Sequence, residues 1–344
     1  MRIGLVVPLQ GPAGIFGPSC EAVAATAVAQ LNETGVLGRE VTVELIDGGA
    51  PTDDVAADVR RAVDDGSVDA ITGWHISAIR HGLAPVVADR VPYVYTSLYE
   101  GGERRHGIFC SGETPRQQIA PALRWLRDHH GLRRWFIVGD DYVWPRASVA
   151  ATLEFAHELD LQVAGTAYVP LGSHDFAAVV DRVRASAAHG VLLYLVGQDA
   201  VRFNRAFAAA GLDADMARFT PLMEENMLLA SGLGAVHNLF VSAAFFRSMA
   251  TGGAIDLVGA YVAQHGADAP PLNNAAESCY EGIMTLAALA RQADSLDVRR
   301  MVACSAGLGY DGPRGPMSMD RGHLRQPVHL AAADGYDFDV LASL

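Results

Sequence analysis

Short runs of β-branched residues alternate along this chain with longer segments in which apolar residues recur every three or four positions. The first pattern is typical of buried strands, and the second of helices with one apolar face. Their alternation predicts crossover helices wound around a parallel sheet. The predicted strands of the first half are 2–8, 40–47, 69–73 and 93–96, and its predicted helices are 17–31, 53–64 and 77–89.

The pattern begins again at residue 116, which predicts a second wound sheet. The predicted strands there are 134–139, 162–168, 190–195, 218–222 and 239–243, and the helices are 116–129, 145–159, 175–187, 199–210 and 226–231. A helical stretch follows, 254–264, 274–293 and 297–303, which has no sheet of its own to cover and is expected to return to the first lobe. The tail alternates with period two, and its Gly-turn-strand pattern near 334–341 predicts a hairpin at a sheet edge.

We therefore expect an α/β fold with two doubly wound parallel-sheet lobes joined by a multi-strand hinge. A chain of 344 residues is long enough for two such lobes. Lobe 1 is predicted to comprise 1–117 and 247–320, and lobe 2 to comprise 118–246 and 321–344. The ligand cleft is expected between them.

Polar and aromatic residues stand where the predicted strands end. His75 and Ser77 follow the strand 69–73, and Ser77 opens the next helix. In open α/β sheets, ligands bind beyond the carboxyl ends of the strands, where helix N-termini offer free N–H groups. Ser77 is equally suited to capping its own helix. His75 has no second histidine at metal-ligand spacing, so a hydrogen-bonding pocket wall is favoured over a structural role, a metal ligand or a general base.

The strand 93–96 brings a second group to the same edge, namely Tyr95, Thr96 and Ser97. In the second half, Tyr142 and Trp144 precede a predicted helix. Such rings suit a small amphipathic guest, although ordinary core packing would also explain them.

Acidic residues follow two predicted strands of the second half. One of Glu224 and Glu225 could accept hydrogen bonds from an ammonium or amide group, although acids at a helix start also complement its dipole. The sequence does not distinguish the two. Asp140 and Asp141 are interpreted as a solvated loop or helix cap.

Composition excludes several classes of function. The net charge of −13 argues against nucleic acid as a direct ligand, because such binding depends on clustered basic residues. All 26 basic residues are Arg, which excludes a Schiff-base or P-loop lysine. The apolar runs fall short of the ~20 residues of a membrane helix. Residues 307–312 match a dinucleotide-binding pattern of glycines but follow a helix, so a loop is predicted there.

The cysteines and the N-terminus bear on the compartment. Cys20, Cys110, Cys279 and Cys304 are too far apart for a C-x-x-C site and are expected to be free thiols. The first strand follows Met1 almost directly, which leaves no room for a secretory leader. A cytoplasmic protein is expected if Met1 is the native start, and a periplasmic one if a leader has been removed.

Several segments resemble the type I periplasmic-binding-protein family. They read IGLVVPLQGPAG, VYTSLYEG, IVGDDYVWPR, YLVGQDAVRFNRA and GPMSMDRGH, and together they cover nearly the whole chain in order. Within this family the chain is similar to the amide-sensing negative regulator of aliphatic amidase operons. It is also similar to the urea and branched-chain amino-acid binding proteins of ABC importers.

This resemblance implies a clamshell that closes on a small molecule without breaking a bond. It places first-lobe contacts at His75, Ser77, Tyr95 and Ser97, and second-lobe contacts at Tyr142, Trp144 and the region 223–225. The chain departs from the amide sensor at His75 and Ile76, where that protein has tyrosine and threonine, and its Y-P-T-P run is replaced by YTSL.

The favoured function is a non-catalytic receptor for a short aliphatic amide or urea-like molecule, with closure signalled to a regulatory protein. The alternative is the substrate-binding protein of an ABC importer for amino acids, urea or amides, with a permease as partner. An amide hydrolase using His75 is a third alternative, and a structural module a fourth. A homodimer is left open, and no cofactor or metal is expected.

Overall fold

Each half of the chain winds its helices around a sheet of its own. The computed structural model describes residues 1–344, which divide into two units. Unit 1 comprises Met1–Gly112 and Met249–Pro327, and unit 2 comprises Glu113–Ser248 and Val328–Leu344. The chain therefore passes from one unit to the other after Gly112, Ser248 and Pro327.

Unit 1 is built on an eight-stranded sheet in the order β11-β12-β13-β5-β4-β3-β1-β2. Its strands are β1 (Arg2–Val7), β2 (Thr42–Asp47), β3 (Ala70–Gly73), β4 (Tyr93–Tyr95), β5 (Ile108–Cys110), β11 (Gly309–Gly312), β12 (Gly315–Asp320) and β13 (His323–Arg325). Its helices are α1 (Gly17–Thr34), α2 (Thr52–Asp64), α3 (Ser77–Val87), α9 (Gly252–His265), α10 (Asn274–Ala293) and α11 (Val298–Cys304), with a 3-10 turn, η1 (Pro12–Phe16). The strands from β5 to β2 run parallel, whereas β11, β12 and β13 pair antiparallel.

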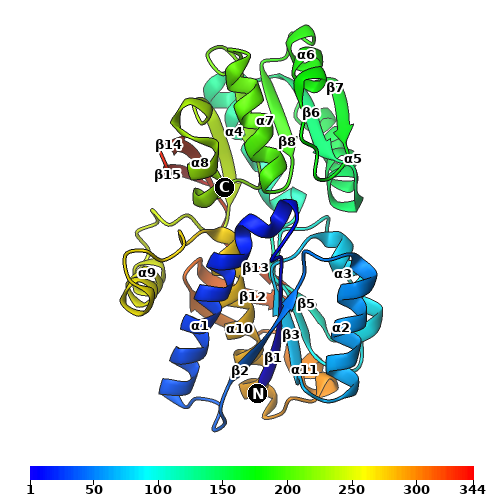
Figure 1. Ribbon diagram of the computed structural model, residues 1–344, viewed down its shortest axis with the longest axis vertical. Coiled ribbons are helices and arrows are strands. Elements are labelled where there is room, and N and C mark those ends of the chain that lie inside the picture. The colour runs from blue at the N-terminus through cyan, green and yellow to red at the C-terminus, as the bar shows by residue number, and fades with distance from the viewer. The chain divides into compact units, whose positions relative to one another are not determined.

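Helices cover both faces of this sheet. Helices α2 and α3 lie side by side on one face, and α1 and α10 on the other (Figure 1). Apolar side chains such as Val6, Ile71, Val59 and Leu83 form the core beneath α2 and α3. Helix α1 stops at Gly35, whose φ of 59° is left-handed and easily adopted only by glycine.

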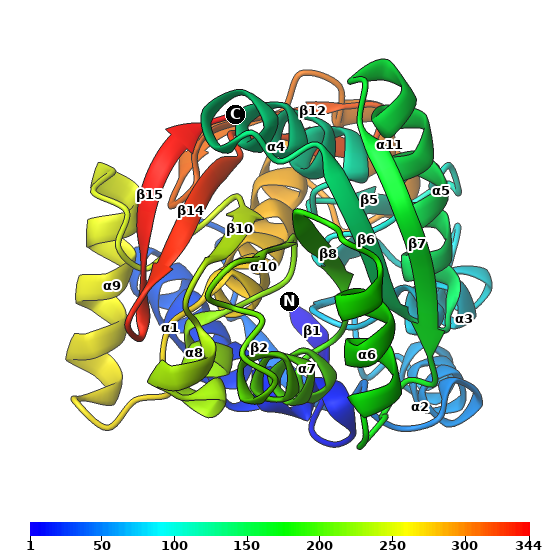
Figure 2. The same cartoon turned by 90° about the horizontal axis from the view of Figure 1, so that it is seen from above.

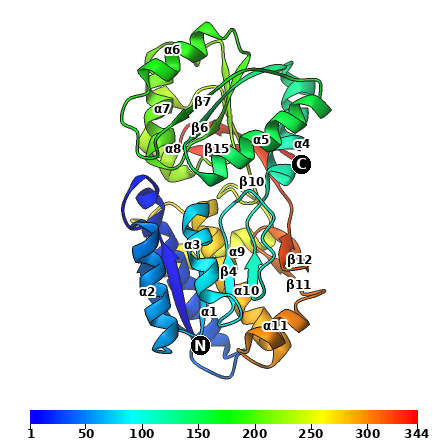
Figure 3. The same ribbon diagram turned by 90° about the vertical axis from the view of Figure 1, so that its right-hand side faces the viewer.

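Unit 2 is built on a seven-stranded sheet in the order β15-β14-β10-β9-β8-β6-β7. Its strands are β6 (Arg134–Asp140), β7 (Gln162–Val169), β8 (Gly190–Tyr194), β9 (Ala217–Thr220), β10 (Leu239–Ala243), β14 (His329–Asp334) and β15 (Asp337–Ser343). Its helices are α4 (Pro115–His130), α5 (Val143–Glu158), α6 (Ala177–Ala185), α7 (Gln198–Ala209) and α8 (Glu225–Ser231), followed by a 3-10 turn, η2 (Leu233–Ala235). Figures 2 and 3 show α4 and α5 on one face of this sheet and α6, α7 and α8 on the other.

The predicted pair of doubly wound sheets is confirmed, with antiparallel strands added at one edge of each. The tail hairpin, β14 and β15, extends the sheet of unit 2 beside β10. In unit 1 the strand order reverses between β1 and β3, and in unit 2 between β6 and β8. Open α/β sheets form their ligand crevices at such points, so these strand ends are where a site is expected.

Three details differ from the sequence-based expectation. Strand β5 was not predicted, because it follows β4 without a crossover helix between them and so falls outside the alternating pattern. The predicted loop at 307–312 is wrong, since Gly309–Gly312 forms β11 and pairs antiparallel with β12. Unit 1 also continues to Pro327, beyond the predicted boundary at 320, because β13 pairs with β5.

Candidate functional site

In unit 1 the loops after β3 and β4 are held together by hydrogen bonds. Ser97 Oγ accepts from the backbone N–H of His75 at 2.9 Å and donates to the His75 carbonyl at 2.7 Å. The hydroxyl of Tyr95 donates to the same carbonyl at 2.9 Å. The structure thus brings Tyr95, Ser97 and His75 together at the carboxyl edge of the sheet, beside the start of α3.

The His75 ring is completely buried, and both of its nitrogens are engaged within unit 1. Nδ1 donates to the Val6 carbonyl at 3.0 Å, which leaves Nε2 to accept from the Tyr93 hydroxyl at 2.6 Å. Burial lowers the pKa of His75 to about 4. The imidazole is therefore neutral at pH 7, and it ties β1 to β4.

Ser77 is the first residue of α3, and no side chain caps this helix. Its hydroxyl lies 3.5 Å from that of Tyr95. Burial by itself would raise the pKa of the neighbouring Glu100, but a hydrogen bond from Ser77 and the charge of Arg80 outweigh it and hold that pKa below its usual value. The helix N-terminus thus adjoins a carboxylate that is ionised at neutral pH.

Arg80 was not singled out from the sequence, although it lies one turn after Ser77 on the same face of α3. Its guanidinium is buried and donates to the carboxylates of Glu100 and Glu103. It also lies over the rings of Tyr95 and Tyr99, at 5.4 and 5.1 Å from their centroids. These ion pairs and ring contacts hold the buried side chains beneath the start of α3 in place.

Thr96 points to the opposite face of the sheet from Tyr95 and Ser97, as alternation along a strand requires. Its Oγ1 accepts from Ser278 of α10 at 3.0 Å. A Cβ at Gly282 would approach Thr96 Cγ2 to 2.6 Å, so the contact with α10 depends on that glycine. Thr96 therefore anchors the helix rather than joining the group around His75.

In unit 2, Tyr142 and Trp144 stand at the start of α5. Their ring centroids are 6.3 Å apart, and Trp144 packs edge-on against Tyr194 at 5.6 Å. Trp144 is buried, whereas Tyr142 is only half-buried. Of the two, Tyr142 has the more accessible ring.

The interpretation of Asp140 as a solvated residue is wrong, because its side chain is fully buried at the end of β6. Its Oδ2 accepts from the N–H of Val196 at 2.8 Å, across the point where the strand order reverses. Burial and the charge of the neighbouring Asp199 raise the pKa of Asp140 to about 9. Asp141 is exposed, as expected, and pairs with Arg146 at 2.5 Å. The sequence did contain a signal for this burial, because Asp140 directly follows the strand predicted over 134–139.

Glu224 and Glu225 lie at the start of α8 and are both buried. Oε1 of Glu225 accepts from the N–H of Arg247 at 2.9 Å within unit 2. Burial raises the pKa of Glu225 to about 7. Glu225 is therefore turned toward the segment after β10, and Glu224 occupies the N-cap position.

Nearly the whole chain matches one known protein family. The model of a family described as periplasmic binding proteins matches residues 1–337. The chain belongs to this periplasmic binding protein family.

No group of three or more His, Cys, Asp or Glu side chains is placed to hold a metal ion, and all four cysteines are free thiols. None of the helices combines the length and apolar character needed to cross a bilayer.

The Leu/Ile/Val-binding protein BraC3 of Rhizobium johnstonii is 35% identical to this periplasmic binding protein over 196 residues. That match spans 54% of this chain and 52%, about half, of the relative. An ABC-transporter solute-binding protein of Rhodopseudomonas palustris HaA2, solved with p-hydroxybenzoic acid, has a TM-score of 0.89 at 18% identity, over 100% of this chain and 96% of that one. The leucine-binding protein LivK of Thermotoga maritima MSB8 has a TM-score of 0.85 at 19% identity, over 100% and 98%. At these identities, the two structural likenesses establish the fold.

Proposed function

We propose that this chain is the solute-binding component of an ABC importer and holds a small carboxylate-bearing molecule between its two units. The family match over residues 1–337 carries this proposal. The named ligands of its relatives, leucine and p-hydroxybenzoic acid, both carry a carboxylate. These relatives favour transport over the amide-sensing regulation that the sequence first indicated, with a permease as partner and the periplasm as compartment.

The start of α3 is the proposed seat of the ligand carboxylate. No side chain caps this helix, so no side chain competes for its first-turn N–H groups, although the Ser77 hydroxyl would have to turn from Glu100 toward the ligand. Helix N-termini attract anions through these groups and through the helix dipole. Hydrogen bonds among Tyr95, Ser97 and His75 hold the loops after β3 and β4 in one geometry. Little conformational entropy is therefore lost when a ligand binds.

Unit 2 is proposed to supply the opposite wall. Tyr142 is proposed to pack its ring against the apolar part of the ligand. Trp144 in turn packs against Tyr142. Glu224, at the N-cap position of α8, is proposed as the acceptor for an amino-acid ammonium. An aromatic acid would contact the rings and would not need this acceptor.

A thermal-shift screen tests this function directly, since a ligand that binds only the folded state raises the melting temperature. The panel contains leucine, valine, benzoate, 4-hydroxybenzoate, acetamide and urea. We expect one acid to stabilise the protein and to bind saturably in calorimetry. Stabilisation by acetamide or urea alone would support the amide sensor instead.

Catalysis is tested on the same samples. We propose that the chain binds without bond cleavage, since His75 is buried and both of its ring nitrogens are engaged, by the Val6 carbonyl and the Tyr93 hydroxyl. Incubation with acetamide should release no ammonia above the protein-free rate. Steady ammonia release would overturn the non-catalytic assignment.

A further inference from the structure

One turn in unit 1 contacts the chain near each of the three places where it crosses between the units. The crossings follow Gly112, Ser248 and Pro327. The turn comprises residues 312–315 and joins β11 to the antiparallel strand β12. We refer to it as the β11–β12 turn. None of the predicted site residues lies in it.

Arg314, within this turn, contacts the first and third crossings. Its Nη1 donates to the carbonyl of Ser111 at 3.4 Å and to Oε1 of Gln326 at 3.1 Å. The side-chain amide of Gln326 donates in turn to the Ser111 carbonyl at 2.8 Å. Ser111 is followed by Gly112, the last residue before the first crossing, and Gln326 by Pro327, the last before the third. The guanidinium therefore joins these two segments where they leave unit 1.

The second crossing returns to unit 1 just before α9, and this segment contacts the same turn. The hydroxyl of Thr251 donates to the Pro313 carbonyl at 3.1 Å, and its oxygen also caps α9 by accepting from the N–H of Ala254 at 3.2 Å. A Cβ at Gly253 would lie 2.6 Å from the carbonyl oxygen of Gly312, so the two backbones approach this closely only because no side chain lies between them. The turn is thus bonded to all three crossing segments.

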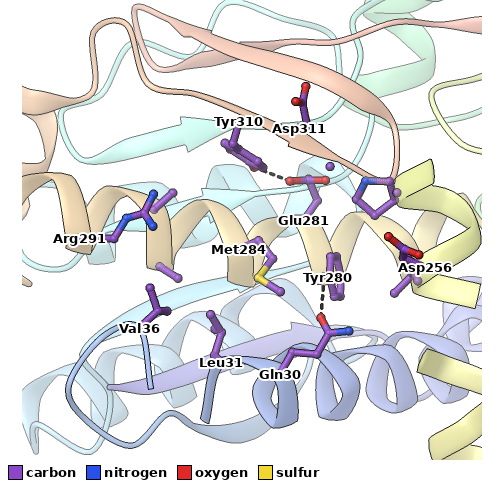
Figure 4. A pocket seen from close by; sticks show the side chains of 16 residues that line it. Gln30, Leu31, Val36, Asp256, Tyr280, Glu281, Met284, Arg291, Tyr310 and Asp311 are labelled. Atoms are coloured by element: carbon purple, nitrogen blue, oxygen red, sulfur yellow. Dashed lines mark hydrogen bonds between the residues drawn. The ribbon is translucent and has the colours of Figure 1, made fainter. Parts of the chain in front are cut away.

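A buried ion pair holds the turn itself in place. Nε of Arg314 donates to Glu277 of α10, and neither side chain exposes any surface. Glu277 is hydrogen-bonded to Glu281, which accepts from Tyr310 of β11 (Figure 4). The guanidinium presents its donors in a rigid planar fork, so its contact with Glu277 also fixes the direction of Nη1. The crossing segments are therefore attached through Arg314 to α10.

The first crossing also contacts a loop of the proposed site. A Cβ at Gly112 would overlap the carbonyl oxygen of Ser97, so the chain passes directly against this peptide. Ser97 holds the backbone of His75 through two hydrogen bonds. A displacement of the first crossing would therefore also displace the loops beside the start of α3.

We propose that the β11–β12 turn is a clamp that fixes the unit-1 ends of all three crossings, with Arg314 as its central positioning residue. Fixed ends limit the number of relative orientations that the two units sample without a ligand. When the clamp is loosened, closing on a ligand costs more conformational entropy, so binding weakens although no contact with the ligand is lost. The effect on binding rests on the proposed function, whereas the range of orientations does not.

Double electron–electron resonance on the full chain measures this range without a ligand. Nitroxide labels are attached at two exposed helix positions, through Ala57→Cys in α2 and Glu154→Cys in α5, in a Cys304→Ser background whose other cysteines are buried. Gln326→Leu keeps the size of the side chain but removes both of its hydrogen bonds. We expect its distance distribution to be roughly 1.5-fold broader than that of the labelled parent, because more orientations are sampled.

A second variant tests the middle crossing. In Thr251→Asp the carboxylate still caps α9 but cannot donate to the Pro313 carbonyl, so the distribution should broaden here too. Gln292→Leu is the matched control, because it also removes a hydrogen bond from a glutamine to a backbone carbonyl, but one between α10 and the end of α11. Arg314 is left in place, since its loss would leave Glu277 as an unpaired buried charge.

Ligand kinetics provide the second readout. Gln326→Leu should raise the dissociation rate of the best acid from the thermal-shift screen about threefold and leave the association rate unchanged. Its melting temperature without ligand should fall no further than that of Gln292→Leu. An unchanged distribution in either clamp variant would overturn the proposal, and so would equal broadening in Gln292→Leu. If no acid binds, the proposed function fails, while the ligand-free distributions still decide whether the clamp exists.

Discussion

Two buried polar side chains, His75 in unit 1 and Asp140 in unit 2, each connect neighbouring strands of their own sheet. Each lies near the point where the strand order of that sheet reverses. His75 donates to the Val6 carbonyl of β1, and Asp140 accepts from the Val196 N–H after β8. Both are in their uncharged form near neutral pH, because burial penalises the charge. At the residue scale, these groups stiffen the loops around the proposed site.

His75 makes stability depend on mildly acidic pH. Its pKa is about 4 when folded and near 6.5 when unfolded, so the unfolded chain binds the extra proton between these values. The stability is fully present above pH 6.5 and falls as the pH drops toward 4, by up to about 3 kcal/mol. Urea unfolding between pH 7.5 and 4.5 measures this loss. His75→Gln should flatten the pH dependence, whereas His157→Gln, an exposed change, should not.

Asp140 produces the opposite dependence. Its pKa is raised in the folded state, so folding retains a proton there and stability falls as the pH rises from about 4 to about 9. Asp140→Asn cannot ionise and should lose less stability than the wild-type protein between pH 6 and 9. Urea unfolding at these two pH values provides the comparison. Asp141→Asn, at the exposed neighbour, is the control, and equal pH slopes in all three proteins would contradict the assignment.

Ser77 tests the proposed carboxylate seat. Ser77→Ala should weaken binding of the best acid from the screen at least tenfold, or about 1.4 kcal/mol, because it removes a hydroxyl from the uncapped start of α3. The melting temperature without ligand should fall only slightly, because the hydrogen bond from Ser77 to Glu100 is lost while Arg80 still pairs with that carboxylate. Calorimetry of Ser77→Ala beside Ser67→Ala, a serine outside the site, gives the answer. Equal affinity in both variants would remove Ser77 from the site.

At the scale of elements, the N-cap of α10 links two helices. The Asn273 side chain accepts from the Ala276 N–H at 2.8 Å and donates to Ser19 Oγ of α1 at 3.1 Å. Asp297 caps α11 in the same way, accepting from Arg300, but on the surface. Asn273→Ala should therefore cost more than the roughly 1 kcal/mol expected for Asp297→Ala. Urea unfolding of both variants measures this difference, and equal losses would show that the link to α1 contributes nothing.

At the scale of the whole molecule, the proposed function requires the two units to close on the ligand. A ligand shifts this equilibrium only as far as it prefers the closed form. Small-angle X-ray scattering should show a smaller radius of gyration at saturation with the best acid. Ser77→Ala at the same acid concentration should remain close to its ligand-free value. An unchanged radius in the saturated wild-type protein would contradict closure.

The hydrophobic pattern was sufficient to predict both sheets and their crossover helices, because each element has a period and clear stops such as Gly35. It was also sufficient to place His75, Ser77, Tyr95 and Ser97 at strand ends, since parallel strands bring their carboxyl ends to one edge. Strand β5 was not predicted, because no helix separates it from β4 and the alternating pattern gives no sign of it.

The sequence by itself therefore determined the winding of the chain and the edge of each sheet that carries polar groups, because both follow from local periodicity. Only the tertiary structure decided which of these groups are buried. Asp140 is buried because β6 lies in the interior of its sheet, and Glu281 is buried because β11 passes over α10 there. Burial and charge pairing depend on residues far apart in the chain, so no local pattern records them.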